Sequence, residues 1–127
     1  MDRILLVGMG GFLGALLRYW IGGAVQNWSR SVQFPYGTLA VNLIGCLTIG
    51  LLSYLADTRG VLSTEARSFL MIGLLGAFTT FSTFSNETIN LLRDGENVLS
   101  LLNIGAHTLF GLAAVWLGRS LAHLIWR

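Results

Sequence analysis

The chain has 127 residues, of which 54% are hydrophobic and only 11% are charged, and its mean hydropathy is +0.68. A soluble domain carries about 25% charged residues, so this composition excludes an ordinary soluble globular protein and indicates a membrane protein. All eight basic residues are arginine, and the net charge of +2 is spread along the chain. Without a basic patch, we expect no nucleic-acid partner.

Four apolar stretches are long enough to cross a bilayer, which takes about 20 residues of helix because lipid offers no partner for backbone polar groups. We predict an all-α membrane protein with four transmembrane helices, roughly over residues 3–26, 37–56, 66–93 and 97–124. Arg18 interrupts the first apolar run and no Ala-x-Ala pattern follows, which favours a retained helix over a signal peptide. The connectors are short, so residues 1–127 are interpreted as one multi-pass domain in a bacterial plasma (inner) membrane.

The arginines give little orientation signal under the rule that basic residues stay cytoplasmic. The side of both termini collects Arg3, Arg59, Arg67, Arg119 and Arg127, whereas the opposite side has Arg18, Arg30 and Arg93. Such a chain can insert both ways, which permits an antiparallel homodimer. Gly10 and Gly14 have the spacing that allows close helix contact, a second reason to expect association between chains, although glycine is common in membrane helices.

In the second predicted helix, Asn42 stands alone among apolar residues. Its carboxamide has two N–H donors and one acceptor oxygen. We leave two roles open for it: a hydrogen bond between helices, or a donor to an anion at the wall of a pathway.

Residues 79–85, TTFSTFS, place five hydroxyl groups and two phenylalanines in seven positions of the third helix. The hydroxyls would point all around a helix, and Gly76 loosens the helix just before them. One alternative is a continuous helix whose hydroxyls bond to carbonyls of the preceding turn. We favour a break near residues 76–82, because broken helices at membrane depth line cavities and ion sites.

Phe81 and Phe84 are three residues apart and fall on one helical face. Aromatic rings have a positive edge, so the pair could contact a small anion without a fixed positive charge. Glu87 either extends to the membrane interface or sits in a vestibule beside the hydroxyl run. In the fourth helix, Thr108 is a candidate donor along a pathway and His107 is interpreted as a packed residue. No nucleophile–base pair or metal cluster is visible in the sequence, which argues against an enzyme.

Three segments together resemble the small fluoride channels of the CrcB, or Fluc, family: GGFLGALLRY at 10–19, GTLAVNLIG at 37–45 and GAFTTFSTFSNE at 76–87. The resemblance implies a four-helix subunit inserted in both orientations and paired as an antiparallel homodimer. It also implies two pores that pass fluoride passively out of the cell.

Carried over by position, the resemblance implies that Asn42 donates to fluoride and that Phe81 and Phe84 form an aromatic box. The remaining residues expected along the pathway are Ser82, Thr83, Glu87 and Thr108. The backbone carbonyls of Gly76 and Thr79 are expected to hold a structural sodium ion (Na+) at the two-fold axis of the dimer. The chain departs from the family at Ala77 and Phe78, and at Leu112, where a hydroxyl residue is common.

The main rival is a small proton-coupled multidrug-type exporter, which needs a carboxylate within the membrane. Glu87 is the one candidate for that carboxylate. A structural membrane subunit without transport activity is a third class; for it, apolar replacements of Asn42 or Phe84 would affect only stability.

Overall fold

The computed structural model describes residues 2–127. Its helical elements are α1 (Arg3–Ser29), α2 (Tyr36–Asp57), α3 (Thr64–Arg67), η1 (Ser68–Leu75), α4 (Gly76–Phe78), α5 (Phe81–Arg93), α6 (Asn97–Gly105), η2 (Ala106–Phe110) and α7 (Gly111–Ile125). The segments η1 and η2 are π-helical, with a wider turn than the α-helix. The sequence reasoning did not predict these two segments.

Four helical stretches are long and apolar enough to cross a membrane: Arg3–Ser29, Tyr36–Asp57, Thr64–Arg93 and Asn97–Ile125. This is the all-helical, four-span architecture expected from the hydropathy of the chain. The first helix continues past the expected residue 26 to Ser29, where Arg30 adopts a left-handed conformation and its N–H bonds to the carbonyl of Asn27.

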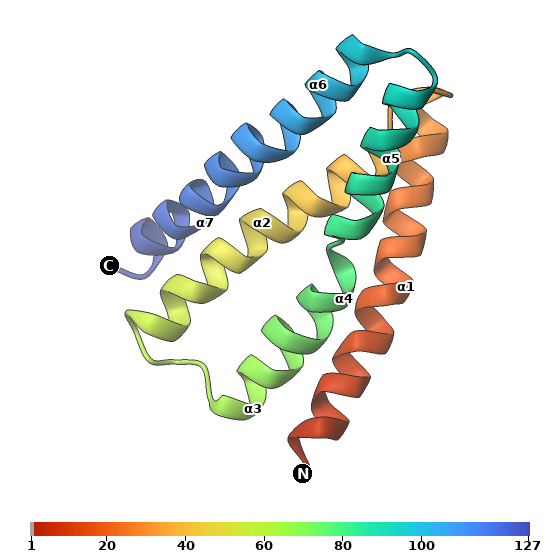
Figure 1. The fold of residues 1–127 in the computed structure, drawn as a ribbon. Helices are drawn as coiled ribbons and strands as arrows, with labels where there is room; N and C mark the ends of the chain where they lie inside the picture. The colour runs from red at the N-terminus through yellow and green to blue at the C-terminus, as the bar shows by residue number, and fades with distance from the viewer. Residues whose placement is uncertain (1) are drawn as a thin grey trace.

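The third span contacts two different parts of the fold along its length (Figure 1). Its first half is formed by α3, η1 and α4, of which η1 and α4 pack along α1, whereas α5 lies beside α6. The remaining pair, α2 with α7, makes the most extensive helix contact in the chain. The main neighbour of the third span therefore changes from α1 to α6, and the change occurs between α4 and α5.

Backbone contact holds the first half of the third span against α1. A Cβ atom added at Gly10 would lie 2.3 Å from the carbonyl oxygen of Phe69, and one added at Gly14 would lie 2.1 Å from that of Leu74. Only glycine permits this approach. The Gly10 and Gly14 spacing thus serves packing within the chain, and the use of it above as an argument for association between chains was wrong.

Candidate functional site

The helix of the third span stops at Phe78 and begins again at Phe81. Thr79 has φ −87° and ψ 158°, and Thr80 has φ −153° and ψ 115°, so both are extended. The two residues lie inside the range 76–82 in which the sequence predicts a break. Extended backbone at membrane depth needs hydrogen-bond partners other than the helix ladder.

Asn42 on α2 supplies the partner for Thr80. Its Nδ2 donates to the Thr80 carbonyl oxygen at 3.0 Å, and its Oδ1 accepts from the Thr80 N–H at 2.8 Å. The carboxamide thus pairs with the extended backbone as a neighbouring strand would. Since Nδ2 carries two hydrogens, one N–H remains for another acceptor. The two roles left open for Asn42, interhelical bond and anion donor, are therefore compatible.

The hydroxyl groups of the run end one helix and begin the next. Thr79 Oγ1 donates to the Leu75 carbonyl at 3.0 Å. Thr80 Oγ1 accepts from the Thr83 N–H at 3.2 Å and donates to Thr83 Oγ1 at 3.0 Å, which caps the N-terminus of α5. Neighbouring hydroxyls in the sequence thus support different helices.

The break releases carbonyls of residues 76–79 from the helix ladder, among them those of Gly76 and Thr79. In a continuous α-helix the Thr80 N–H would bond to the Gly76 carbonyl and the Thr83 N–H to the Thr79 carbonyl. Here the first N–H donates to Asn42 and the second to the side chain of Thr80. The carbonyls of Gly76 and Thr79 thus lose their helical donors, which leaves oxygen acceptors of the kind that hard cations bind.

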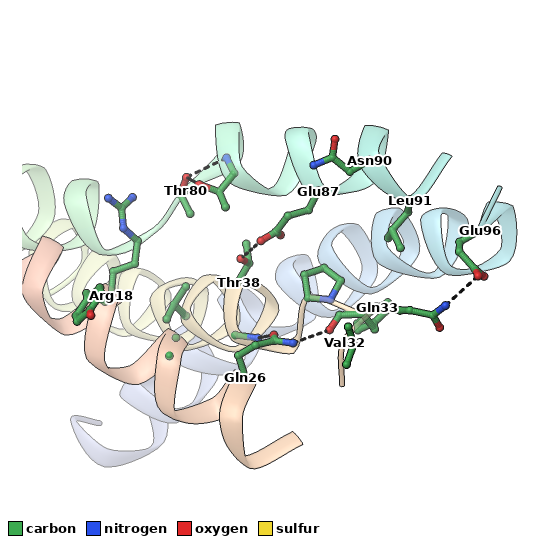
Figure 2. Close-up of a pocket in the computed structure, with 18 of the residues that line it drawn as sticks. Arg18, Gln26, Val32, Gln33, Thr38, Thr80, Glu87, Asn90, Leu91 and Glu96 are labelled. Carbon is green, nitrogen blue, oxygen red and sulfur yellow. Dashed lines mark hydrogen bonds between the residues drawn. The ribbon is translucent and has the colours of Figure 1, made fainter. Parts of the chain in front are cut away.

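A cavity of about 900 Å³ lies between α1, α2 and α5. Figure 2 shows Glu87 extending from α5 toward Thr38 on α2, and Thr38 Oγ1 donates to Glu87 Oε1 at 2.7 Å. Glu87 Oε2 is buried without a hydrogen-bond partner among residues 2–127. Arg18 and Thr83 also line this cavity. We refer to it as the first cavity.

The wall of the first cavity includes the loop between α1 and α2, which Gln26 holds in place. Its Nε2 donates to the Ser31 carbonyl at 2.7 Å and to the Phe34 carbonyl at 3.1 Å, and its Oε1 accepts from the Gly37 N–H at 2.9 Å. The mouth is also bounded by Gln33, which donates to Glu96 at 3.0 Å (Figure 2). Polar groups from α1, α2 and α5, together with the loop that Gln26 holds, therefore contribute to the wall of the first cavity.

A second cavity of about 550 Å³ lies on the other side of the break. Phe81 and Phe84 line it with their ring centroids 5.5 Å apart, and the Phe84 ring lies 4.3 Å from that of His107. Asn42, His107 and Thr108 also line it, together with the hydroxyl residues Thr79 and Thr80 at the break. Thr80 lines both cavities, so the break forms the wall between them.

The residues predicted for the pathway therefore fall into two groups. Thr83 and Glu87 line the first cavity, and the second is lined by Asn42, Phe81, Phe84 and Thr108, with Gly76 and Thr79 beside them.

Two further residues were singled out from the sequence: Ser82, expected along the pathway, and Leu112, where a hydroxyl residue is common in the family. Ser82 is exposed and lines neither of these cavities; its hydroxyl lies 3.4 Å from Thr80 Oγ1. Leu112 lines the second cavity and is 68% exposed. One turn after Thr108, the fourth span therefore presents an apolar side chain instead of a hydroxyl group.

Among the polar residues that sequence reasoning missed are Gln26, Thr38, Thr80 as a helix cap, and Asn103. The preference of threonine for N-cap positions could have indicated Thr80. Asn103 is an amide within an apolar span, and the cost of such groups in lipid was a sufficient reason to single it out. Nothing in the local sequence pairs Thr38 with Glu87, because the two are 49 residues apart.

Four apolar spans, with two cavities that meet where the third span is interrupted, define a multi-pass helical membrane protein. Residues 5–119 match the family described as CrcB-like protein, Camphor Resistance (CrcB). The chain therefore belongs to this family, and the prediction from its motifs is confirmed.

Curated relatives of the chain carry the name of one activity. The chain is 48% identical over 122 residues to Fluoride-specific ion channel FluC 3 of Methanosarcina barkeri, covering 96% of this chain and 91% of the relative. It is 50% identical over 119 residues to Fluoride-specific ion channel FluC 1 of Methanosarcina acetivorans, covering 94% and 89%. It is 40% identical over 124 residues to Fluoride-specific ion channel FluC of Methylobacillus flagellatus, covering 98% and 97%.

Proposed function

We propose that the chain is a passive, selective fluoride channel that exports cytoplasmic fluoride down its electrochemical gradient. The observation that carries the proposal is the junction at Thr80, where a polar cavity and an aromatic-lined cavity meet beside the free N–H of Asn42. Relatives of nearly the same length are named fluoride-specific ion channels. We assign the pathway to the two cavities in sequence.

The chemistry of the lining suits a small, strongly hydrated anion. A channel must replace the donors of water with contacts strong enough for entry and weak enough for exit. The described residues that line the second cavity include no arginine, so a permeating anion would meet the Asn42 amide, the Thr108 hydroxyl and ring edges. The absence of a positively charged side chain in that lining avoids a direct ion pair that would trap the anion. Arg18 and Glu87 in the first cavity would influence which ions enter it.

We propose that a structural sodium ion is held by the carbonyls of Gly76 and Thr79. Both carbonyls have lost their helical donors, which is what oxygen ligands for such an ion require. Among the described residues, no three His, Cys, Asp or Glu side chains lie close enough together to hold a metal ion. A metal at this position would therefore depend on backbone oxygens. A sodium ion bound there would supply positive potential near the pathway without blocking it.

We further propose that two copies form an antiparallel homodimer in the plasma membrane. Phe81 is 79% exposed and Thr108 is exposed, so one chain alone leaves part of the second cavity open to lipid. A hydroxyl facing lipid is costly, and a second copy would cover it. Because Cys46 is the single cysteine, Cys46→Ser provides a cysteine-free background. In that background we expect an impermeant maleimide to label both Val32→Cys and Val61→Cys from outside the cell; labelling of only one loop would exclude dual topology.

The test of the function is fluoride efflux from liposomes that contain purified protein, followed with a fluoride electrode in a potassium gradient with valinomycin. We expect rapid fluoride efflux, no chloride efflux, and loss of the fluoride signal in Phe84→Ile. Phe12→Ile is the matched control, since Phe12 is 66% exposed on α1 and lines neither cavity. A folded preparation without fluoride efflux would contradict the proposal.

A proton-coupled multidrug-type exporter is the second candidate, because Glu87 is a half-buried carboxylate in a cavity of about 900 Å³. The variant Glu87→Gln separates the two. For a channel, we expect fluoride efflux to change by no more than about two-fold, since the loss of one negative charge favours anion entry slightly. An exporter would lose substrate transport driven by a pH gradient.

A further inference from the structure

A buried polar cluster joins α5 to α6. Ser100 and Asn103 are both 0% exposed, and Thr88 is buried beside them. Ser100 Oγ donates to the Thr88 carbonyl at 3.2 Å, and Asn103 Nδ2 donates to Thr88 Oγ1 at 2.9 Å. Polar groups at membrane depth are costly unless they are partnered, and where they occur they are candidates for a functional role. The cluster lines neither cavity itself, so its effect has to pass through a residue that does.

Thr88 carries this contact to Phe84. Its Oγ1 donates to the Phe84 carbonyl at 2.8 Å. A hydroxyl has one hydrogen, so Thr88 accepts from Asn103 rather than donating to it, which also fixes the orientation of the Asn103 carboxamide. The backbone of Phe84 is thereby connected to the fourth span through two hydrogen bonds.

Whereas Thr88 contacts the backbone of Phe84, His107 contacts its aromatic ring. Its Nδ1 lies 3.0 Å from the Asn103 carbonyl oxygen, and since a carbonyl only accepts, Nδ1 carries the hydrogen. This bond sets the orientation of the imidazole, whose centroid lies 4.3 Å from that of Phe84 at an interplanar angle of 39°. Aromatic pairs in such offset arrangements attract one another beyond the burial of their area.

These contacts form a closed circuit: Phe84 to Thr88, Thr88 to Asn103, Asn103 to His107, and His107 back to Phe84. We propose that Asn103 and His107 are positioning residues that set the place and tilt of the Phe84 ring in the second cavity. The consequence for permeation rests on the proposed function, whereas the placement of the ring does not.

Phe81 provides the internal comparison. Its carbonyl also accepts from a hydroxyl one turn later, Ser85 Oγ at 2.9 Å, but the described fourth span gives Ser85 no hydrogen bond and Phe81 no ring contact. Phe81 is 79% exposed. The two rings therefore differ: this chain fixes Phe84 by itself, and leaves Phe81 without the same support.

The first arm of the test observes the ring directly. The protein is prepared with 4-fluorophenylalanine at position 84, and its ¹⁹F NMR resonance is recorded in nanodiscs for His107→Leu and Thr88→Val. We expect the resonance to shift and broaden in both, because one variant removes the ring contact and the other breaks the circuit with little change of volume. An unchanged resonance in both variants would overturn the proposal.

Two variants with the same chemistry serve as controls. Thr48→Val removes a hydroxyl that donates one turn back to the Ile44 carbonyl at 2.8 Å, outside both cavities. His123→Leu removes the other histidine of the fourth span, which contacts Tyr54 and lines neither cavity. We expect neither control to move the resonance at position 84; if both move it as far as His107→Leu does, the effect is general and the proposal fails.

The second arm measures fluoride efflux per folded protein. We expect His107→Leu to lower it roughly five-fold, as loss of an aromatic contact does, and His107→Phe, which keeps a ring, to recover part of the rate. Equal rates in the parent and in His107→Leu, with a shifted resonance, would overturn the role of the positioning in permeation. A parent without any efflux would contradict the proposed function, and the NMR arm would still decide whether the two residues position Phe84.

Discussion

The two halves of the third span are held by different kinds of contact. In the first half, η1 and α4 are apolar and lie against α1, where η1 meets it through glycine positions at which backbone contacts backbone. The second half, α5, is attached through side-chain hydrogen bonds to Asn42 and Thr38 on α2 and to Asn103 on α6. The first half therefore depends on shape and the second on polar chemistry. Substitutions in the first half should consequently lower the thermal stability of the protein, and substitutions in the second half should lower fluoride efflux.

The largest effect is expected where the second half begins. Asn42→Leu removes both hydrogen bonds to Thr80 and leaves a buried N–H and carbonyl without partners. Leaving these two groups unpaired costs roughly 3 kcal/mol of interaction free energy. Because the junction lies on the proposed pathway, we expect the barrier to permeation to rise by a similar amount, which lowers fluoride efflux by about 100-fold. The measurement is efflux per folded protein in liposomes.

Asn27→Leu is the control for this variant, because Asn27 is exposed near the end of α1 and lines neither cavity. Its efflux should match that of the parent. An Asn42→Leu protein that conducts normally would show that the junction at Thr80 does not form the path.

The next largest effect belongs to the first half and concerns stability. Gly14→Ala places a Cβ atom 2.1 Å from the Leu74 carbonyl oxygen, so α1 and η1 must separate. Overpacking of this kind costs about 2 kcal/mol, and thermal denaturation in detergent should show a lower transition temperature. Efflux per remaining folded protein should be little changed.

Gly8→Ala on the same helix has no heavy atom within 4 Å of the added Cβ, so its transition temperature should stay at the parent value. If Gly14→Ala abolishes efflux while the protein remains folded, the claim that the first half of the third span contributes to stability and the second half to the pathway is incorrect.

The smallest effect on efflux is expected at Thr80, which lies between the two halves of the third span. Thr80→Val removes the cap of α5 but keeps the extended backbone and its bonds to Asn42. Loss of a threonine cap costs about 1 kcal/mol, which corresponds to roughly a five-fold decrease in efflux if α5 carries the pathway. Thr48→Val, measured in parallel, should have the rate of the parent. Equal rates in both variants would mean that the cap does not contribute.

Much of this arrangement could be predicted from the sequence alone. Hydropathy located the four spans, and Gly76 followed by five hydroxyl groups indicated where the third one changes conformation. The partner of Thr80 could not be identified with certainty, because Asn42 had two plausible roles and pairing over 38 positions is a tertiary fact. The division of the predicted residues between two cavities was also missed, since periodicity along a helix does not show which neighbouring helix faces each side.

His107 is the residue whose interpretation changed most. As a lone histidine in an apolar span it is a packed side chain, and it is packed here. What the sequence did not indicate is the identity of its neighbours: the Asn103 carbonyl, which comes from its own helix, and Phe84, which lies 23 positions earlier on another helix. Local spacing could have given the first contact but not the second.

The bond between Asn42 and Thr80 also has a consequence for the order in which the protein is made. Asn42 precedes Thr80 by 38 positions, so the ribosome delivers the amide to the membrane before the backbone that it pairs with. Chains fold from the N-terminal end during synthesis, and α1, α2 and α5 with their caps all lie within the first 94 residues. The interruption of the third span can therefore form while the fourth span is still being translated, and the last helix then arrives at a surface that is already shaped.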